Sequence, residues 1–203
     1  MQIENHKEEV PFEHYKQQFL SADPQDVCDR LSGVRWDGKE FTVTLMGRTY
    51  HISHPEFDIR AEDGKKLPPL PVQTFLMRYL MLSRDVQWNG QWKTFREMPS
   101  GELYIKPYTG RVLTRAAYSF GTRVEAFRTA CEKMHAVPLN HGDAGFQFDF
   151  IGGYQIQILV WAGDEEFPPS AQVIYSDNFA AGFAAEDRVV AGDILISTIK
   201  TFM

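Results

Sequence analysis

Three segments near the carboxyl end of the chain alternate apolar and polar residues, and they constrain the fold more than any other part of the sequence. In FQFDF the side chains of Phe146, Phe148 and Phe150 share one face of an extended strand, because neighbouring residues of a strand point to opposite sides. The segments YQIQILVW (154–161) and AQVIY (171–175) follow the same pattern. We therefore predict three strands here, with the last two forming a hairpin.

Helical patterns precede and follow these strands. Apolar residues spaced three to four apart predict helices in the segments 12–20, 24–32, 72–85, 111–134 with a break at Gly121, and 185–199, the last of them amphipathic. Residues 34–54 predict a three-stranded meander with a tight turn at Asp37-Gly38. The aromatic-rich segment 88–109 is expected to be loop-like with short strands. Helices and strands occur in runs, which predicts an α+β fold with mixed or antiparallel sheets and packed helices.

The 203 residues, 43% of them apolar, suit one domain over 1–203, and the pattern allows an N-terminal subdomain of helices and meander over residues 1–60. The 21 basic and 27 acidic side chains give a net charge of −6, which argues against nucleic acid as a partner. The amino terminus lacks the pattern of a signal peptide, and apolar runs stay far below the length of a membrane span, so we expect a cytoplasmic protein without a membrane partner.

The two cysteines, Cys28 and Cys131, lie far apart in the sequence. Because the chain has no CxxC pair, it cannot by itself supply the four thiolates of an iron–sulfur cluster or of a four-cysteine zinc site.

The segment WAGDEEFPP contains the first candidate site, three adjacent acids between the hairpin strands. If strand geometry continues into the tip, Asp164 and Glu166 converge while Glu165 points away, and carboxylates so placed can bind a hard cation or act as an acid/base pair. The alternative, which we favour, is a solvated loop tip stiffened by Pro168-Pro169.

The segment HGDAG is the second candidate, with His141 and Asp143 on either side of a glycine. The carboxylate of Asp143 could orient the imidazole of His141 as a ligand for a metal or for corrinoid cobalt. We favour a structural interpretation in which Asp143 accepts a hydrogen bond from its own local backbone, as in an Asx turn.

The aromatic residues of the middle segment are the third candidate: Trp88, Trp92, Phe95, Tyr104 and Tyr108. Planar macrocycles bind against aromatic surfaces of this kind, although packing in a core is the commoner role.

The carboxy-terminal sequence resembles domain-of-unknown-function family 3786 of anaerobic bacteria and archaea. Members of that family share a Gly-Asp-Ala-x-Phe-x-Phe stretch, which here begins at Gly142, and an apolar strand ending in Trp-x-Gly-Asp-Glu-Glu-Phe-Pro, here Trp161 to Pro168. The segments LPPLPVQTFLMRYL and GTRVEAFRTACEKM are also similar, so the resemblance covers most of the chain. Two departures are Ile151-Gly152-Gly153 in place of a proline-rich strand entry, and Ala162 where the family often has glutamate.

Some family members resemble fusions with the iron–sulfur domain of corrinoid proteins. The resemblance implies a cofactor-binding or accessory module for a corrinoid or other haem-like tetrapyrrole in anaerobic redox or one-carbon metabolism, with an iron–sulfur or corrinoid protein as partner. We expect binding and not catalysis, in a pocket between the aromatic segment and the hairpin. The candidate binding residues are Trp88, Trp92, Tyr104, Tyr108, His141, Asp143, Trp161, Asp164 and Glu166.

Two alternatives remain. One is a metal-assisted hydrolase that uses Asp164, Glu166 and His141. The other is a non-catalytic interaction subunit whose acidic tip steers a basic partner.

Overall fold

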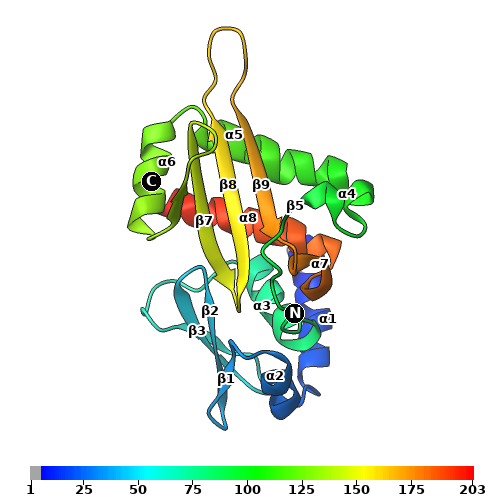
Figure 1. Cartoon of the computed structure of the whole chain (residues 1–203). Helices are drawn as coiled ribbons and strands as arrows, with labels where there is room; N and C mark the ends of the chain where they lie inside the picture. The colour runs from blue at the N-terminus through cyan, green and yellow to red at the C-terminus, as the bar shows by residue number, and fades with distance from the viewer. Residues whose placement is uncertain (1–5) are drawn as a thin grey trace. The chain divides into compact units, whose positions relative to one another are not determined.

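A computed structural model describes residues 6–203, and the chain divides into two compact units, Met1–Val86 and Gln87–Met203. The predicted α+β class is confirmed, because helices pack with strands that pair only in antiparallel fashion within each unit (Figure 1). The expected subdomain over residues 1–60 lies inside the first unit, which continues to Val86. None of the helices over residues 6–203 combines the length and apolar character needed to cross a bilayer.

Over residues 6–86, the first unit forms three helices and a small sheet. Its elements are α1 (His6–Phe19), α2 (Pro24–Arg30), β1 (Arg35–Trp36), β2 (Glu40–Leu45), β3 (Arg48–Ser53), β4 (Ile59–Ala61) and α3 (Leu70–Leu82). Helix α2 begins as predicted, with the Asp23 carboxylate accepting a hydrogen bond from the Gln25 amide at 2.9 Å. The turn after β1 is fixed by Asp37, whose carboxylate accepts hydrogen bonds from the Lys39 and Glu40 amides. The predicted meander is confirmed, and β4 adds a strand beside β3.

The second unit contains the hairpin and the terminal helix. Its strands are β5 (Trp92–Thr94), β6 (Val137–Leu139), β7 (Ala144–Ile151), β8 (Tyr154–Trp161) and β9 (Ser170–Ser176). Its helices are the 3-10 turn η1 (Phe95–Glu97), α4 (Gly101–Tyr108), the π-helical stretch η2 (Thr109–Thr114), α5 (Arg115–Phe120), α6 (Val124–Lys133), α7 (Phe179–Gly182) and α8 (Ala185–Thr201).

The strands of the second unit pair in the order β6–β7–β8–β9–β5. Helices α5, α6 and α8 cover one face of this sheet (Figure 1). The phenylalanines predicted to share a face on β7 are buried there, and Phe146 meets Phe127 of α6 edge to face at 5.6 Å between ring centroids. The alternating pattern of the three strands therefore placed the core correctly.

The terminal helix α8 is amphipathic with a narrow polar stripe. Ten of its residues are buried. Except for Thr198, the exposed and half-exposed positions follow one line along the helix: Glu186, Val190, Asp193, Ser197, Lys200 and Thr201. Gly192 lies on the buried side, and a β-carbon there would come within 2.7 Å of Val112 Cγ1 of η2. The absence of a side chain at Gly192 lets α8 approach η2 closely.

The prediction that segment 88–109 is loop-like with short strands is wrong in its second half. The short strand β5 is present, but residues 101–108 form helix α4. Helix α4 carries Gly101 at its start and Pro107 near its end, two residues that oppose a helical interpretation of the sequence. After α4 the chain continues through η2 into α5. Pro107 has no amide proton and so cannot donate a hydrogen bond within a regular helix, and the π-helical stretch η2 begins two residues after it.

Candidate functional site

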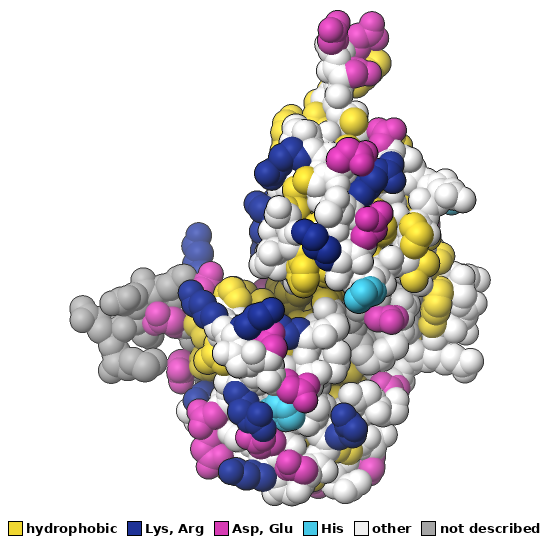
Figure 2. Space-filling view, turned by 90° about the vertical axis from the view of Figure 1, so that its left-hand side faces the viewer, with side chains coloured by type: hydrophobic (Ala, Val, Ile, Leu, Met, Phe, Trp, Pro, Cys, Tyr) yellow, Lys and Arg dark blue, Asp and Glu magenta, His cyan; other side chains and the backbone are white. Residues whose placement is uncertain are grey.

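The hairpin of β8 and β9 extends beyond the rest of its unit and ends in the three acids (Figure 1). We call residues 163–168 the hairpin tip. All six are exposed, and Phe167 has 67% of its surface accessible. Figure 2 shows acidic side chains gathered at the end of the hairpin with a hydrophobic side chain beside them. The tip thus presents carboxylates and an aromatic ring to the solvent together.

The backbone of the tip is fixed by Asp164. Its carboxylate oxygen Oδ1 accepts hydrogen bonds from the amides of Glu166 at 2.9 Å and Phe167 at 2.7 Å, and its own amide donates to the Phe167 carbonyl at 2.9 Å. The strand geometry that we assumed for the tip is therefore wrong, because residues 162–169 lie outside β8 and β9. Asp164 stabilises the turn, and Glu165 and Glu166 are directed outward from it.

The loop 162–169 begins where β8 ends, and hydrogen bonds join this point to the segment 141–143. The Asp143 carboxylate accepts a hydrogen bond from the Ala162 amide at 2.7 Å, and the Asp143 amide donates to the Val160 carbonyl at 2.9 Å. Arg128 of α6 donates a hydrogen bond to the Asp143 carbonyl. The local Asx-type turn that we favoured for Asp143 is therefore wrong, since its carboxylate reaches across to the base of the hairpin.

Two glycines complete this base. A β-carbon on Gly121, at the end of α5, would lie 2.6 Å from Pro169 Cβ and 2.8 Å from the Trp161 carbonyl oxygen. Gly142 has a φ of 72°, and a β-carbon there would lie 2.8 Å from the Val160 carbonyl oxygen. Neither position has room for a side chain, so both glycines permit a close backbone approach to the hairpin. We call Gly121, Gly142, Asp143, Ala162 and Pro169 the hairpin base.

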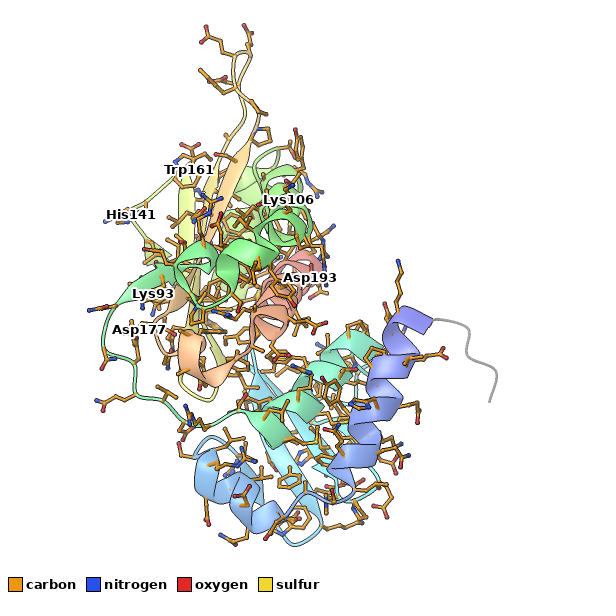
Figure 3. All side chains as sticks on the ribbon, turned by 90° about the vertical axis from the view of Figure 1, so that its right-hand side faces the viewer. Lys93, Lys106, His141, Trp161, Asp177 and Asp193 are labelled. Carbon is orange, nitrogen blue, oxygen red and sulfur yellow. The ribbon has the colours of Figure 1, made fainter. Side chains whose placement is uncertain are left out.

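His141 and Trp161 lie on the same side of the unit, opposite Asp193 of α8 (Figure 3). His141 is exposed before β7 begins, and Trp161 ends β8 with 38% of its surface accessible. The arrangement places both rings at the surface beside the hairpin base.

The aromatic candidates lie at the opposite end of β9. Trp92 pairs with Ser176 at the end of β9, whereas Trp161 pairs with Ser170 at its beginning. Seven residues of strand separate the two groups by about 20 Å. The candidate residues therefore form two groups, and the structure does not bring them around one pocket.

Within the aromatic group, Trp88, Trp92 and Tyr104 reach the surface, whereas Phe95 and Tyr108 are in the core. Trp88 and Trp92 are half-exposed and meet edge to face at 5.1 Å between ring centroids. Tyr108 is buried, stacked on Phe95 at 3.9 Å, with its hydroxyl 3.3 Å from that of Tyr175. Burial raises the pKa of both phenols. Tyr104 is exposed on α4.

The loop that carries Trp88 is held in place by polar contacts. Trp88 Nε1 donates to the Gln91 carbonyl at 2.9 Å, and the amide and side chain of Asn89 both donate to the Asp177 carboxylate at 3.2 Å. The two tryptophans thus form a small, ordered aromatic surface beside β5.

Across residues 6–203, no three or more His, Cys, Asp or Glu side chains are grouped so that they could hold a metal ion. The hydrolase alternative with Asp164, Glu166 and His141 stays a prediction. The carboxylates of Asp164 and Asp143 accept hydrogen bonds from backbone amides, which is a structural use of both.

Sequence patterns did not indicate the roles of Gly121 in the hairpin base and of Arg128 beside it. Arg128 lies in a segment with ordinary helical spacing, and Gly121 predicts only a helix break. Both act through contacts with residues more than a dozen positions away, Asp143 and Pro169.

Comparison with known proteins gives one match. A family model described as a domain of unknown function (DUF3786) matches residues 23–198. Neither the curated proteins nor the solved structures include a match.

Proposed function

This chain belongs to the DUF3786 family, and on that premise we propose that it is a non-catalytic interaction module whose hairpin tip docks on a protein partner. The observation that carries the proposal is Phe167, a large aromatic side chain held 67% exposed at the end of an ordered turn. An aromatic side chain that is both exposed and preorganised loses little conformational freedom when a partner covers it.

The acids beside Phe167 define the kind of partner. Glu165 and Glu166 flank the ring with negative charge, and the chain as a whole carries a net charge of −6. The complementary surface is an apolar pocket for the phenyl ring with lysine or arginine at its rim. Such acids accelerate association and select the partner, while the buried ring contributes most of the affinity.

The experiment places a photo-activatable phenylalanine analogue at position 167 in the native host and identifies the protein that it cross-links. The same analogue at Tyr118, an aromatic residue 59% exposed on α5, is the matched control. Binding of the identified protein is then measured with the purified wild-type chain and with its variants.

We expect Phe167→Ala to weaken binding about 10- to 30-fold. A Glu165→Lys/Glu166→Lys variant should bind more slowly and lose the salt dependence of association. Tyr118→Ala should bind like the wild type. Equal cross-linking from positions 118 and 167, or unchanged affinity of Phe167→Ala, overturns the proposal.

A second candidate, binding of a corrinoid or other haem-like tetrapyrrole, draws support from Trp88 and Trp92. Their half-exposed, edge-to-face rings offer an ordered apolar surface on which a planar macrocycle can stack. An iron–sulfur or corrinoid protein as partner stays a prediction of the family resemblance.

This second candidate is tested by anaerobic titration with a corrinoid and with haem, followed by absorbance. Binding at this surface predicts a spectral shift with the wild type and with Tyr118→Ala, and its loss in Trp88→Ala/Trp92→Ala. The candidate fails if neither compound changes its spectrum in the presence of the wild-type chain.

A further inference from the structure

The pair Asn89-Gly90 lies in the loop that leads into β5 of the second unit. Asn89, Gly90 and Gln91 are exposed, and they belong to neither a helix nor a strand. Gly90 has a φ of 81°, and a β-carbon there would meet no atom within 4 Å outside the adjacent residues. The pair therefore stands in open surroundings, with a backbone conformation that glycine adopts readily.

Polar contacts attach this loop to the end of β9, where Asp177 follows the strand (Figure 3). Asn89 donates to the Asp177 carboxylate twice, from its backbone amide and from its side-chain Nδ2, each at 3.2 Å. The Asp177 amide in turn donates to the Gln91 carbonyl at 3.1 Å. Of these three contacts, the one from Nδ2 requires that the side chain of residue 89 be an amide.

From this geometry we propose that Asn89 is a modification site, which deamidates spontaneously and thereby releases the loop from Asp177. In this reaction the backbone nitrogen of Gly90 forms a bond to Asn89 Cγ. The bond from Cγ to Nδ2 breaks, and Nδ2 leaves as ammonia with the proton of the Gly90 amide. Water then opens the resulting five-membered succinimide at either of its two carbonyls, which yields aspartate or isoaspartate without an oxidant or reductant.

Two features of the pair favour this reaction. Glycine has no β-carbon, so the nitrogen of Gly90 reaches Asn89 Cγ over a wide range of backbone torsion angles. The contact from Nδ2 to Asp177 lies at the upper end of the range of hydrogen-bond distances, and water replaces it easily at an exposed position. The side chain of Asn89 therefore leaves Asp177 readily and turns toward the Gly90 nitrogen.

The other asparagines of the described chain lack one or both features. Asn140 is also exposed, but the next residue is His141, whose side chain restricts the backbone. Asn178 is 4% exposed, and its Oδ1 accepts a hydrogen bond from Ser176 Oγ at 2.6 Å. Asn140 is thus an internal comparison for the effect of the glycine, and Asn178 one for the effect of burial.

The product differs from Asn89 at the contact that held the loop. A carboxylate replaces the donor Nδ2, so two negative charges face each other and repel where a hydrogen bond had been. Isoaspartate also adds one carbon atom to the backbone between Trp88 and Trp92. We expect the loop to separate from Asp177 and the edge-to-face contact of the two tryptophans to be lost. This change is independent of the hairpin tip.

The first test follows the chemistry. The purified full chain is aged at neutral pH and physiological temperature, and peptide mass spectrometry measures the conversion of each asparagine. Asn89 should convert at least about tenfold faster than Asn140, into a mixture of aspartate and isoaspartate. In Asn89→Gln the equivalent ring has six members and forms less easily, so position 89 should stay an amide. Conversion of Asn140 at the same rate as Asn89, or faster, overturns the proposal.

The second test follows the release of the loop through hydrogen exchange at the Asp177 amide. Exchange should be at least about tenfold faster in the aged wild type and in Asn89→Asp than in the fresh wild type. Aged Asn89→Gln, which controls for every other effect of ageing, should exchange like the fresh protein. Circular dichroism checks that each sample keeps its fold. Unchanged exchange at Asp177 after full conversion of Asn89 overturns the proposal.

Discussion

The carboxylate of Asp143 lies 2.7 Å from the backbone nitrogen of Ala162, nineteen residues along the chain. This contact joins the turn before β7 to the point where the hairpin leaves β8. The contact fixes the backbone of Ala162, the first residue of the loop 162–169. The turn stabilised by Asp164 therefore follows directly after an ordered residue.

Asp143→Ala should loosen the hairpin base. Loss of one exposed, charge-assisted hydrogen bond predicts a decrease of about 1 kcal/mol in the free energy of unfolding and faster amide exchange at Ala162. Asp143→Asn keeps an oxygen acceptor and should retain most of the protection. Glu165→Ala, at the tip, should leave the exchange of Ala162 unchanged. Hydrogen exchange followed by mass spectrometry or NMR measures both quantities, and equal exchange in Asp143→Ala and the wild type would contradict the role given to Asp143.

Gly192→Ala should destabilise the second unit although alanine favours helices. The new β-carbon would meet Val112 Cγ1 at 2.7 Å, and this overpacking predicts a loss of about 1–3 kcal/mol. Val112 is fully buried, so Val112→Ala alone should also destabilise by leaving a cavity. The double variant should be more stable than the sum of the two single changes predicts. The alanine at position 112 removes the clash with the new β-carbon, and that β-carbon fills part of the cavity left by Val112→Ala. Denaturant unfolding of all four proteins checks this, and simple additivity would show that the close approach of α8 to η2 is unimportant.

Arg188 is a buried arginine in the first half of α8, with 2% of its surface accessible. Its guanidinium donates to the carbonyls of Pro99 and Ala184 and lies over the ring of Phe95, while its Nη1 has no hydrogen-bond partner within the described residues. Burial lowers the pKa of Arg188. A charge in this position is costly to desolvate, which offsets much of what its contacts contribute.

Replacement of Arg188 should therefore depend on volume more than on charge. Arg188→Met keeps most of the side-chain volume and removes the buried charge, so we expect a change within about 1 kcal/mol. Arg188→Ala leaves a cavity and should cost about 2–4 kcal/mol in the free energy of unfolding. Chemical denaturation distinguishes the two. If Arg188→Met were as damaging as Arg188→Ala, the hydrogen bonds to Pro99 and Ala184 would be the dominant contribution.

The buried pair Tyr108 and Tyr175 predicts a loss of stability in alkali. Burial raises the pKa of both phenols above that of the unfolded chain, which is about 10. Below pH 10 both states keep these protons, whereas above it the unfolded chain releases protons that the folded chain retains, so stability falls as the pH rises. Absorbance of tyrosinate should therefore show Tyr108 and Tyr175 ionising only with unfolding. Tyr175→Phe should remove one tyrosine from this delayed change, and an unaltered change would contradict the assignment.

The strands and the core followed from the sequence because alternation reports directly which side of a strand is buried. Phe146, Phe148 and Phe150 showed the inner face, and Gln147 and Asp149 between them are less buried and lie on the other face of the sheet. The hairpin base did not follow, because Gly121, Asp143 and Ala162 meet only after the chain has folded, and a glycine or aspartate has many local uses. Helix α4 was missed because Gly101 and Pro107 oppose helix formation locally, while burial of Tyr108 against Phe95 favours it.

The turn at the hairpin tip assigns different tasks to adjacent residues. Asp164 holds the turn through its carboxylate, whereas the side chains of Glu165, Glu166 and Phe167 take no part in those hydrogen bonds. Substitutions of the side chains at 165–167 should therefore leave the turn folded, while Asp164 cannot be replaced without losing its two hydrogen bonds. Within four adjacent residues, one side chain serves the fold and the other three are left free for recognition.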